Sequence, residues 1–253
     1  MNRYLKNLNR IEFVVTMSCT GKCKHCSQGE HKSSDNIDKY LAANAVREIA
    51  EEYNISSVMT FGGEPLLYPE TVYEIHKAAK EMNIPKRQLI TNGYFSKDFQ
   101  NIKSVAQKIT ESGVNEILLS VDAFHQETIP LEYVKAFAKE IKESNIKIQV
   151  HPAWLVSSEA DNAYNNRTKE ILEEFNQIGI ETSEGNVIFP SGNALKYLNE
   201  YFNLSDKHKN PYQENPRDIR AICFSANGDI LGGNIYKRDI MKILSSYKPK
   251  IFF

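Results

Sequence analysis

Apolar residues along the chain form short runs that alternate with longer segments of helical spacing, beginning at Ile11. Short runs rich in β-branched and aromatic residues are typical of strands in a parallel sheet, and apolar residues three or four apart are typical of the helices that cover it. The pattern predicts strands at Glu12–Met17, Ser57–Phe61, Gln88–Thr91, Glu116–Val121, Lys147–His151 and Asn186–Phe189. It predicts helices at Asp38–Tyr53, Glu70–Met82, Asp98–Ser112, Leu131–Ser144, Asn166–Ile178 and Ala194–Phe202. This alternation indicates an α/β fold.

Six strand–helix units in series, joined by right-handed crossovers, fit either a partial barrel or an open doubly wound sheet. Both architectures place ligands at the carboxyl ends of the strands. Glycines, prolines and polar residues gather at these ends: Ser18-Cys19, Gly62–Pro65, Asn92-Gly93, Asp122, Pro152 and Pro190–Gly192. We therefore expect six loops to share one face and to form the functional site.

The last fifth of the chain has a different character. Residues 1–203 are expected to form one domain, and residues 204–219, which are polar and contain prolines, read as a linker. Residues 220–253 form a short tail, in which Ala221–Ile230 with the turn Asn227-Gly228 predicts a β-hairpin followed by a short helix.

Composition and charge limit the classes of function. The 253 residues are 41% hydrophobic and 25% charged, as in ordinary globular proteins, and the net charge is −1. Such a balance provides no global attraction for nucleic acid or an anionic membrane. The amino-terminal segment lacks the apolar stretch of a signal peptide, and no run approaches the ~20 apolar residues of a transmembrane helix. We expect a cytoplasmic protein with no nucleic-acid or membrane partner.

Three of the four cysteines, Cys19, Cys23 and Cys26, lie within eight residues directly after the first predicted strand. Disulfide bonds between thiols so close in sequence cannot usefully stabilise a domain of this size. In a reducing compartment such thiols indicate a metal site. Gly21 gives the loop the freedom to wrap three thiolates around one iron–sulfur cube. Because three ligands cannot saturate four irons, the fourth iron would be open to a small-molecule cofactor.

Other interpretations of the cysteines stay open at this point. A structural zinc ion could use His25 with the three cysteines, although His25 directly precedes Cys26 and is poorly placed to complete a tetrahedron. The thiols could also be simple core residues beside Lys22 and Lys24. A non-catalytic iron–sulfur carrier or sensor is a further alternative, but a carrier would be expected to saturate its cluster with four protein ligands.

The spacing of Cys19, Cys23 and Cys26 resembles the CxxxCxxC signature of the radical S-adenosylmethionine (radical SAM) enzymes. The resemblance implies a partial (β/α)6 barrel of the TIM type, a [4Fe-4S] cluster on the three cysteines, and SAM bound to the fourth iron. It also implies that an external electron donor, such as flavodoxin or ferredoxin, drives cleavage of SAM to a 5′-deoxyadenosyl radical, which abstracts hydrogen from an organic substrate. His25 stands where relatives carry an aromatic residue close to the adenine.

Three further motifs resemble the SAM-binding elements of the family. Gly62, Gly63, Glu64 and Pro65 match the GGEP motif, which lies against the SAM amino group. Asn92 stands in the third-strand TNG, and Ser120 with Asp122 matches the fourth-strand SxD near the ribose or substrate. The resemblance therefore implies a cofactor-binding set of His25, Gly62, Gly63, Glu64, Pro65, Asn92, Ser120 and Asp122.

Two family elements are altered. In Pro190–Ala194, Asn193 replaces an arginine that some members carry, and His125-Gln126-Glu127 stands where many peptide-modifying relatives have an arginine for the SAM carboxylate. The tail around Cys223 resembles a truncated, degenerate SPASM domain without the other cysteines, so Cys223 is expected to be a buried remnant. The similarity to SPASM and molybdenum-cofactor members implies peptide maturation, or alternatively a small-molecule or cofactor precursor, as the type of substrate.

Overall fold

A curved parallel sheet of seven strands, in the order β7-β5-β4-β3-β2-β1-β9, forms the centre of the computed structural model, which describes residues 2–30, 33–203 and 213–249. Its strands are β1 (Arg10–Val14), β2 (Ser57–Phe61), β3 (Lys86–Thr91), β4 (Glu116–Leu119), β5 (Lys147–Val150), β7 (Glu181–Thr182) and β9 (Ala221–Phe224). Two small sheets accompany it, one of β6 (Ala153–Trp154) with β8 (Asn186–Val187) and one of β10 (Asp229–Ile230) with β11 (Gly233–Asn234).

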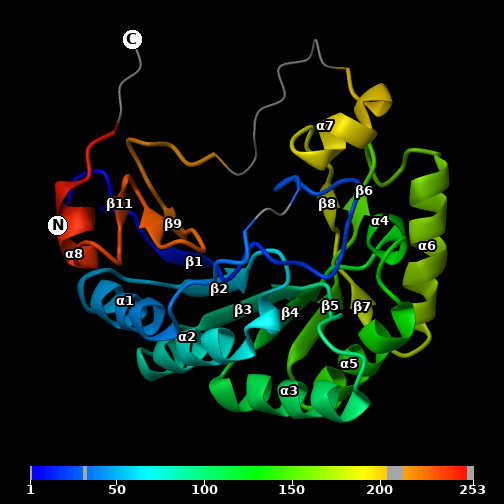
Figure 1. Cartoon of the computed structure of the whole chain (residues 1–253), viewed down its shortest axis with the longest axis horizontal. Helices are drawn as coiled ribbons and strands as arrows, with labels where there is room; N and C mark the ends of the chain where they lie inside the picture. The colour runs from blue at the N-terminus through cyan, green and yellow to red at the C-terminus, as the bar shows by residue number, and fades with distance from the viewer. Residues whose placement is uncertain (1, 31–32, 204–212, 250–253) are drawn as a thin grey trace.

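Helices α1 (Lys39–Glu52), α2 (Pro69–Glu81), α3 (Phe99–Ser112) and α5 (Leu131–Glu143) cover the outer, convex side of the sheet, as Figure 1 shows. The other helices of the described residues are α4 (Ala123–Gln126), α6 (Ala163–Asn176), α7 (Asn193–Tyr197) and α8 (Ile240–Ser246), and α7 lies on the opposite side from α3 in the figure. Asp38, Asp98 and Asn162 start α1, α3 and α6 by accepting hydrogen bonds from free amide groups of the first turn. The α/β partial barrel expected from the sequence is confirmed.

Side-chain alternation on the strands separates a buried face from a concave face. On β1, Ile11 and Phe13 are fully buried against the outer helices. Val14 pairs in register with Phe61, and Ile90 with Leu118, and these half-buried side chains line the concave side. Burying a side chain such as Phe13 contributes about 1.5–3 kcal/mol. The packed outer face therefore fixes the strands, and the concave face is left for ligands.

The predicted sixth strand is wrong in its position. Asn186–Phe189 was expected to join the main sheet, but β7, only Glu181–Thr182, pairs with β5 there, and β8 pairs with β6. The chain crosses over at Gly185, whose φ is +74° and where a Cβ would lie 2.3 Å from the carbonyl oxygen of Pro152. A two-residue polar strand has no apolar run to reveal it, and the apolar residues after it pack elsewhere.

The predicted hairpin at Ala221–Ile230 is also wrong in its pairing. β9 runs parallel to β1 and extends the main sheet, because Phe224 stacks on Phe13 with ring centroids 4.7 Å apart. The hairpin forms between β10 and β11, and α8 follows, so the hairpin-and-helix extension is present after this added strand. Residues 204–212 of the expected linker lie outside the described residues, and the division at residues 204–219 stays a prediction. None of the helices described is long and apolar enough to cross a membrane.

Candidate cluster and cofactor site

The loop after β1 carries Cys19, Cys23 and Cys26, all as free thiols, at the carboxyl end of the sheet. Cys23 is buried, and the other two are partly exposed. Burial raises the pKa of the Cys19 thiol to about 12 and raises that of Cys26. A metal that coordinates such thiols deprotonates them outright, so burial favours metal-bound over free thiolates in this loop.

Gly62 and Gly63 pack directly on the backbone of the cysteine loop. A Cβ on Gly62 would lie 2.4 Å from the Thr16 carbonyl oxygen, and one on Gly63 would lie 2.1 Å from that of Ser18. The amide of Gly63 donates to Thr16 O at 2.8 Å, and the amide of Glu64 donates to Ser18 O at 2.8 Å. Only glycine permits this approach, so the end of β2 holds the start of the cysteine loop.

Glu64 is completely buried and its carboxylate is held by donors of the chain. It accepts hydrogen bonds from the Thr91 hydroxyl at 2.7 Å, the Asn92 amide at 2.8 Å and the Leu66 amide at 2.9 Å. Burial raises its pKa to about 7, against the opposing effect of these hydrogen bonds. Glu64 thus joins the end of β2 to the end of β3, while Pro65 begins a buried 3-10 helix, Pro65–Leu67.

Asn92 connects β3 to the first cysteine. Its side-chain amide lies 3.6 Å from Cys19 Sγ and donates to Thr20 Oγ1 at 3.2 Å, and its Oδ1 accepts from the Tyr94 amide. The main-chain amide of Gly21 also donates to Cys19 Sγ, at 3.4 Å. Amide donors thus surround this sulfur.

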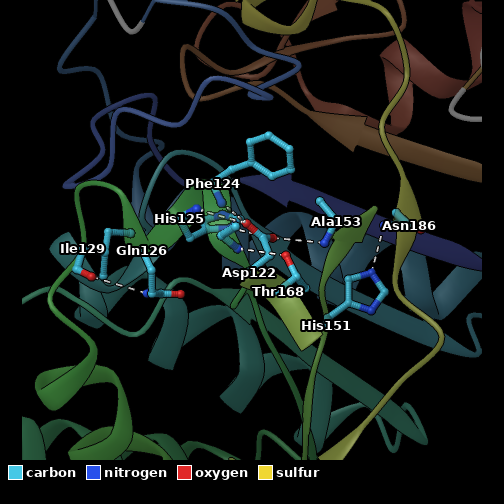
Figure 2. A network of polar contacts seen from close by, with 10 residues as sticks. Asp122, Phe124, His125, Gln126, Ile129, His151, Ala153, Thr168 and Asn186 are labelled. Atoms are coloured by element: carbon cyan, nitrogen blue, oxygen red, sulfur yellow. Dashed lines mark hydrogen bonds and ion pairs between the residues drawn. The ribbon is translucent and has the colours of Figure 1, made fainter. Parts of the chain in front are cut away.

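Asp122 lies at the centre of the polar network in Figure 2, fully buried at the end of β4. Its Oδ1 accepts from the amides of Phe124 and His125, starting α4, and its Oδ2 accepts from the Ala153 amide at 3.0 Å. His125 Nδ1 lies 2.8 Å from the same Oδ2. Burial alone would raise the pKa of Asp122, but the facing His125 holds it well below its usual range.

His25 and His125 pack together beside the buried cysteine. Their rings are 4.8 Å apart and edge-on, and Phe124 contacts His25 at 5.0 Å. Ligand atoms of Cys23, His25 and His125 all lie within 4.8 Å of one another. Burial lowers the pKa of His25 to about 4, so its ring is neutral. Burial also opposes protonation of His125, but Asp122 and Cys23 raise its pKa well above the usual value.

Residues 13–151 match the model of the radical SAM superfamily. The chain belongs to the radical SAM superfamily. Members of this family use a [4Fe-4S] cluster and SAM, as the CxxxCxxC spacing implied.

Curated relatives of similar sequence include proteins named probable GTP 3′,8-cyclase. A probable GTP 3′,8-cyclase of Saccharolobus islandicus (strain L.S.2.15) is 27% identical over 180 residues, which cover 69% of this chain and 54% of the relative. Its counterpart in Methanococcus aeolicus is 29% identical over 160 residues, 58% of this chain and 49% of the relative. The chain thus spans about half the length of these relatives.

Solved radical SAM structures share the fold. Streptococcus suis SuiB bound to S-adenosylmethionine superimposes with a TM-score of 0.59 at 14% identity, covering 95% of this chain and 66% of SuiB. The anSMEcpe structure with bound AdoMet gives a TM-score of 0.59 at 15% identity, covering 94% of this chain and 77% of the other. At such identities the likeness establishes the partial barrel alone.

The donor set of this radical SAM chain fits the cluster and cofactor. The Cys19 sulfur has two donors, the Gly21 amide and the Asn92 side chain. The amides of Gln28 and Gly29 lower the pKa of the Cys26 thiol, against the larger effect of burial, and His125 lies beside Cys23 with ligand atoms of the two residues within 4.8 Å. Hydrogen bonds to sulfur are typical of iron–sulfur sites. The Nδ1 atom of His25 is buried and has no hydrogen-bond partner in the part of the chain described, as expected of a group whose partner is a bound ligand.

The second brace on the cysteine loop was missed at the sequence level. The Asn193 amide donates to Cys26 O at 2.9 Å, and its side chain donates to Cys23 O at 3.1 Å. At Gly192, with φ at +54°, a Cβ would lie 2.6 Å from Cys26 O. At the sequence level Asn193 was interpreted only as the replacement of an arginine, so its contact with the loop was not predicted. The Gly192-Asn193 pair at the start of a helix is the signal that could have indicated it.

The remaining candidates lie farther from the cysteines or along the concave face. Ser120 is half-buried on the concave side after β4, and its amide donates to Thr91 O. His151 is hydrogen-bonded to Ser183 at 2.8 Å and, as Figure 2 shows, to Asn186, also at 2.8 Å. Cys223 pairs in register with Glu12 on the edge strand β9 and is exposed, so its expected burial is wrong. The edge position explains the exposure, because no strand of the described residues pairs with β9 on its other side.

Proposed function

We propose that the protein is a radical SAM enzyme that abstracts hydrogen from an organic substrate. The observation that carries this proposal is the cysteine loop, braced from β2 by Gly62 and Gly63 and from α7 by Gly192 and Asn193. When bound, the cluster and SAM would supply one-electron cleavage of SAM to methionine and a 5′-deoxyadenosyl radical. A loop fixed on both sides presents its three sulfurs in a constant arrangement, as a catalytic cluster requires.

The residues of the chain divide into ligands and supports. Cys19, Cys23 and Cys26 would hold the cluster. His25, whose buried Nδ1 has no hydrogen-bond partner among the described residues, and half-buried Ser120 are the residues that we assign to contact with SAM. Glu64 and Asp122 are both fully buried and accept hydrogen bonds from the chain. We therefore propose that they hold the ends of the strands in position and do not contact SAM directly. Gly62, Gly63, Pro65 and Asn92 complete the supports.

We propose a peptide as the substrate, in preference to a nucleotide. The register places Leu118, Gln149 and Glu181 next to one another on the concave face, and His151 follows Gln149 with the same orientation. A triphosphate would call for basic side chains. Gln149 offers a hydrogen-bonding amide and Glu181 a carboxylate, which suit amides and cationic side chains, whereas both ring nitrogens of His151 are already hydrogen-bonded within the chain. Solved radical SAM structures of similar fold include SuiB bound to precursor peptide SuiA and anSMEcpe with a Cp18Cys peptide.

Two accessory features belong to the same proposal. An external reductant, such as flavodoxin or ferredoxin, would supply the electron, and the protein would work in the cytoplasm, where free thiols persist.

Cluster assembly tests the ligand assignment first. The protein is reconstituted anaerobically with iron and sulfide, and the expected product has a broad absorption band near about 400 nm, characteristic of cubane chemistry. Cys23→Ala should abolish the band, and Cys223→Ala, the matched control on β9, should retain it. A colourless wild-type protein, or loss of the band only in Cys223→Ala, would refute the assignment.

Substrate class is tested with the reconstituted wild-type protein, SAM and a reductant. We expect a cationic peptide library to increase the rate of 5′-deoxyadenosine formation and to yield peptides of altered mass. Stimulation by GTP with no effect of any peptide would overturn the peptide assignment.

A further inference from the structure

We propose that His125, oriented by Asp122, donates a hydrogen bond to Cys23 Sγ and thereby raises the reduction potential of the cluster. The inference rests on the cluster assignment above and adds a positioning residue that the CxxxCxxC motif does not contain.

The geometry forms a relay from a buried carboxylate to a buried sulfur. Asp122 is fully buried, and its Oδ2 lies 2.8 Å from His125 Nδ1. The ligand atoms of His125 and Cys23 lie within 4.8 Å of each other, and the nearby Cys23 contributes to the raised pKa of His125. His25 stacks edge-on against His125 at 4.8 Å and encloses the contact. The relay therefore lies in a low-dielectric environment, where hydrogen bonds to charged groups are strong.

The neighbours of Asp122 determine which way the protons point. Its carboxylate accepts from the amides of Phe124, His125 and Ala153, so it acts as an acceptor towards His125 Nδ1 as well. This leaves Nε2 of the imidazole for Cys23. An iron-bound sulfur has no proton and can only accept, so Nε2–H is the donor.

Cys23 differs from Cys26 in the origin of its donor. The amides of Gln28 and Gly29 beside Cys26 belong to the loop itself. The proposed donor to Cys23 comes from α4, about a hundred residues later, much as the Asn92 donor to Cys19 comes from the end of β3. Hydrogen bonds to cluster sulfurs stabilise the more negative, reduced cluster and so raise its potential.

The same residues suggest a competing interpretation. Cys23, His25 and His125 could hold one zinc ion, with Asp122 orienting His125 as in carboxylate–histidine–zinc sites. We favour the cluster because the loop carries two further cysteines with donors at their sulfurs. Metal analysis of the purified and reconstituted protein separates the two.

The test is a redox titration of the reconstituted cluster at one fixed pH, without SAM, for wild type and variants of equal iron and sulfide content. His125→Phe keeps the ring packing and removes the donor, and Asp122→Asn keeps the helix cap but weakens the orientation. We expect His125→Phe to make the cluster about tenfold harder to reduce, equivalent to about 59 mV for one electron. Asp122→Asn should shift it in the same direction, and His125→Gln, which retains a donor, should shift it less. The control His151→Gln should leave the potential unchanged.

Two results would overturn the proposal. One is a midpoint potential in both His125→Phe and Asp122→Asn that equals that of wild type at full cluster content. The other is one zinc per chain, lost in His125→Phe, in a wild-type protein that takes up no iron. Absence of SAM cleavage by a fully loaded protein would refute the proposed function. The redox titration is made without SAM, so it would still test the role of His125.

Discussion

At the scale of single residues, Glu64 couples protonation to folding. Its pKa is raised from 4.5 to about 7 by burial, so the folded chain binds the proton more tightly than the unfolded chain between those values. Stability contributed by this group is therefore present at low pH and declines as the pH rises from about 4.5 through 7. The shift corresponds to about 3 kcal/mol.

Replacement of Glu64 by Gln should flatten this pH dependence, because glutamine resembles the protonated acid and does not titrate. We expect the stability difference between wild type and Glu64→Gln to change by a few kcal/mol between pH 5 and 8, with wild type losing more. Urea unfolding at both pH values measures it. Parallel pH profiles for the two proteins would contradict the buried, raised-pKa state of Glu64.

Gly63 provides a second residue-level prediction. Gly63→Ala forces a Cβ to within 2.1 Å of Ser18 O, so the cysteine loop must move, and we expect most of the bound iron to be lost. Gly232→Ala is the control: its φ of +78° costs about 1–2 kcal/mol, but no atom lies within 4 Å of the new Cβ. Iron content after reconstitution should fall only in the first variant; equal iron in both would show that the loop does not depend on Gly63.

At the scale of elements, the start of α7 acts as a brace on the cysteine loop. Asn193→Ala removes the donor to Cys23 O and leaves that carbonyl less well satisfied, a loss of about 1–3 kcal/mol. We expect faster release of iron to a chelator. Asn166→Ala, which removes only an exposed bond to Asp161, should release iron at the wild-type rate. Equal rates of iron release from Asn193→Ala and Asn166→Ala would show that α7 does not brace the cysteine loop.

Strands β1 to β5 could be predicted because their apolar runs are set by burial between helices and the concave face. β7 could not, because Glu181-Thr182 has no apolar signal and is defined only by pairing with β5. The cysteines and Gly62–Glu64 were recognisable as motifs. The packing of the two glycines on Thr16 and Ser18, and the approach of His125 to Cys23, join segments distant in sequence, which no local pattern reveals.

At the scale of the whole molecule, β9 makes the tail part of the main sheet. Phe224 is fully buried and stacks on Phe13, so Phe224→Ala should destabilise the protein by about 3–5 kcal/mol. Val187→Ala, at a position 53% exposed, should have little effect. Urea unfolding measures both, and a Phe224→Ala protein as stable as wild type would show that β9 contributes nothing to the core.

The molecule as a whole places a braced cysteine loop at the carboxyl end of a half-barrel whose concave face is apolar at Val14, Phe61, Ile90 and Leu118 and polar towards β5 and β7. We propose above all that this site cleaves SAM. The most direct measurement is 5′-deoxyadenosine formed from SAM by the anaerobically reconstituted protein with a strong reductant. We predict formation that depends on the reductant and is lost in Cys23→Ala; a fully loaded wild-type cluster that forms none, with or without peptide, would contradict the account.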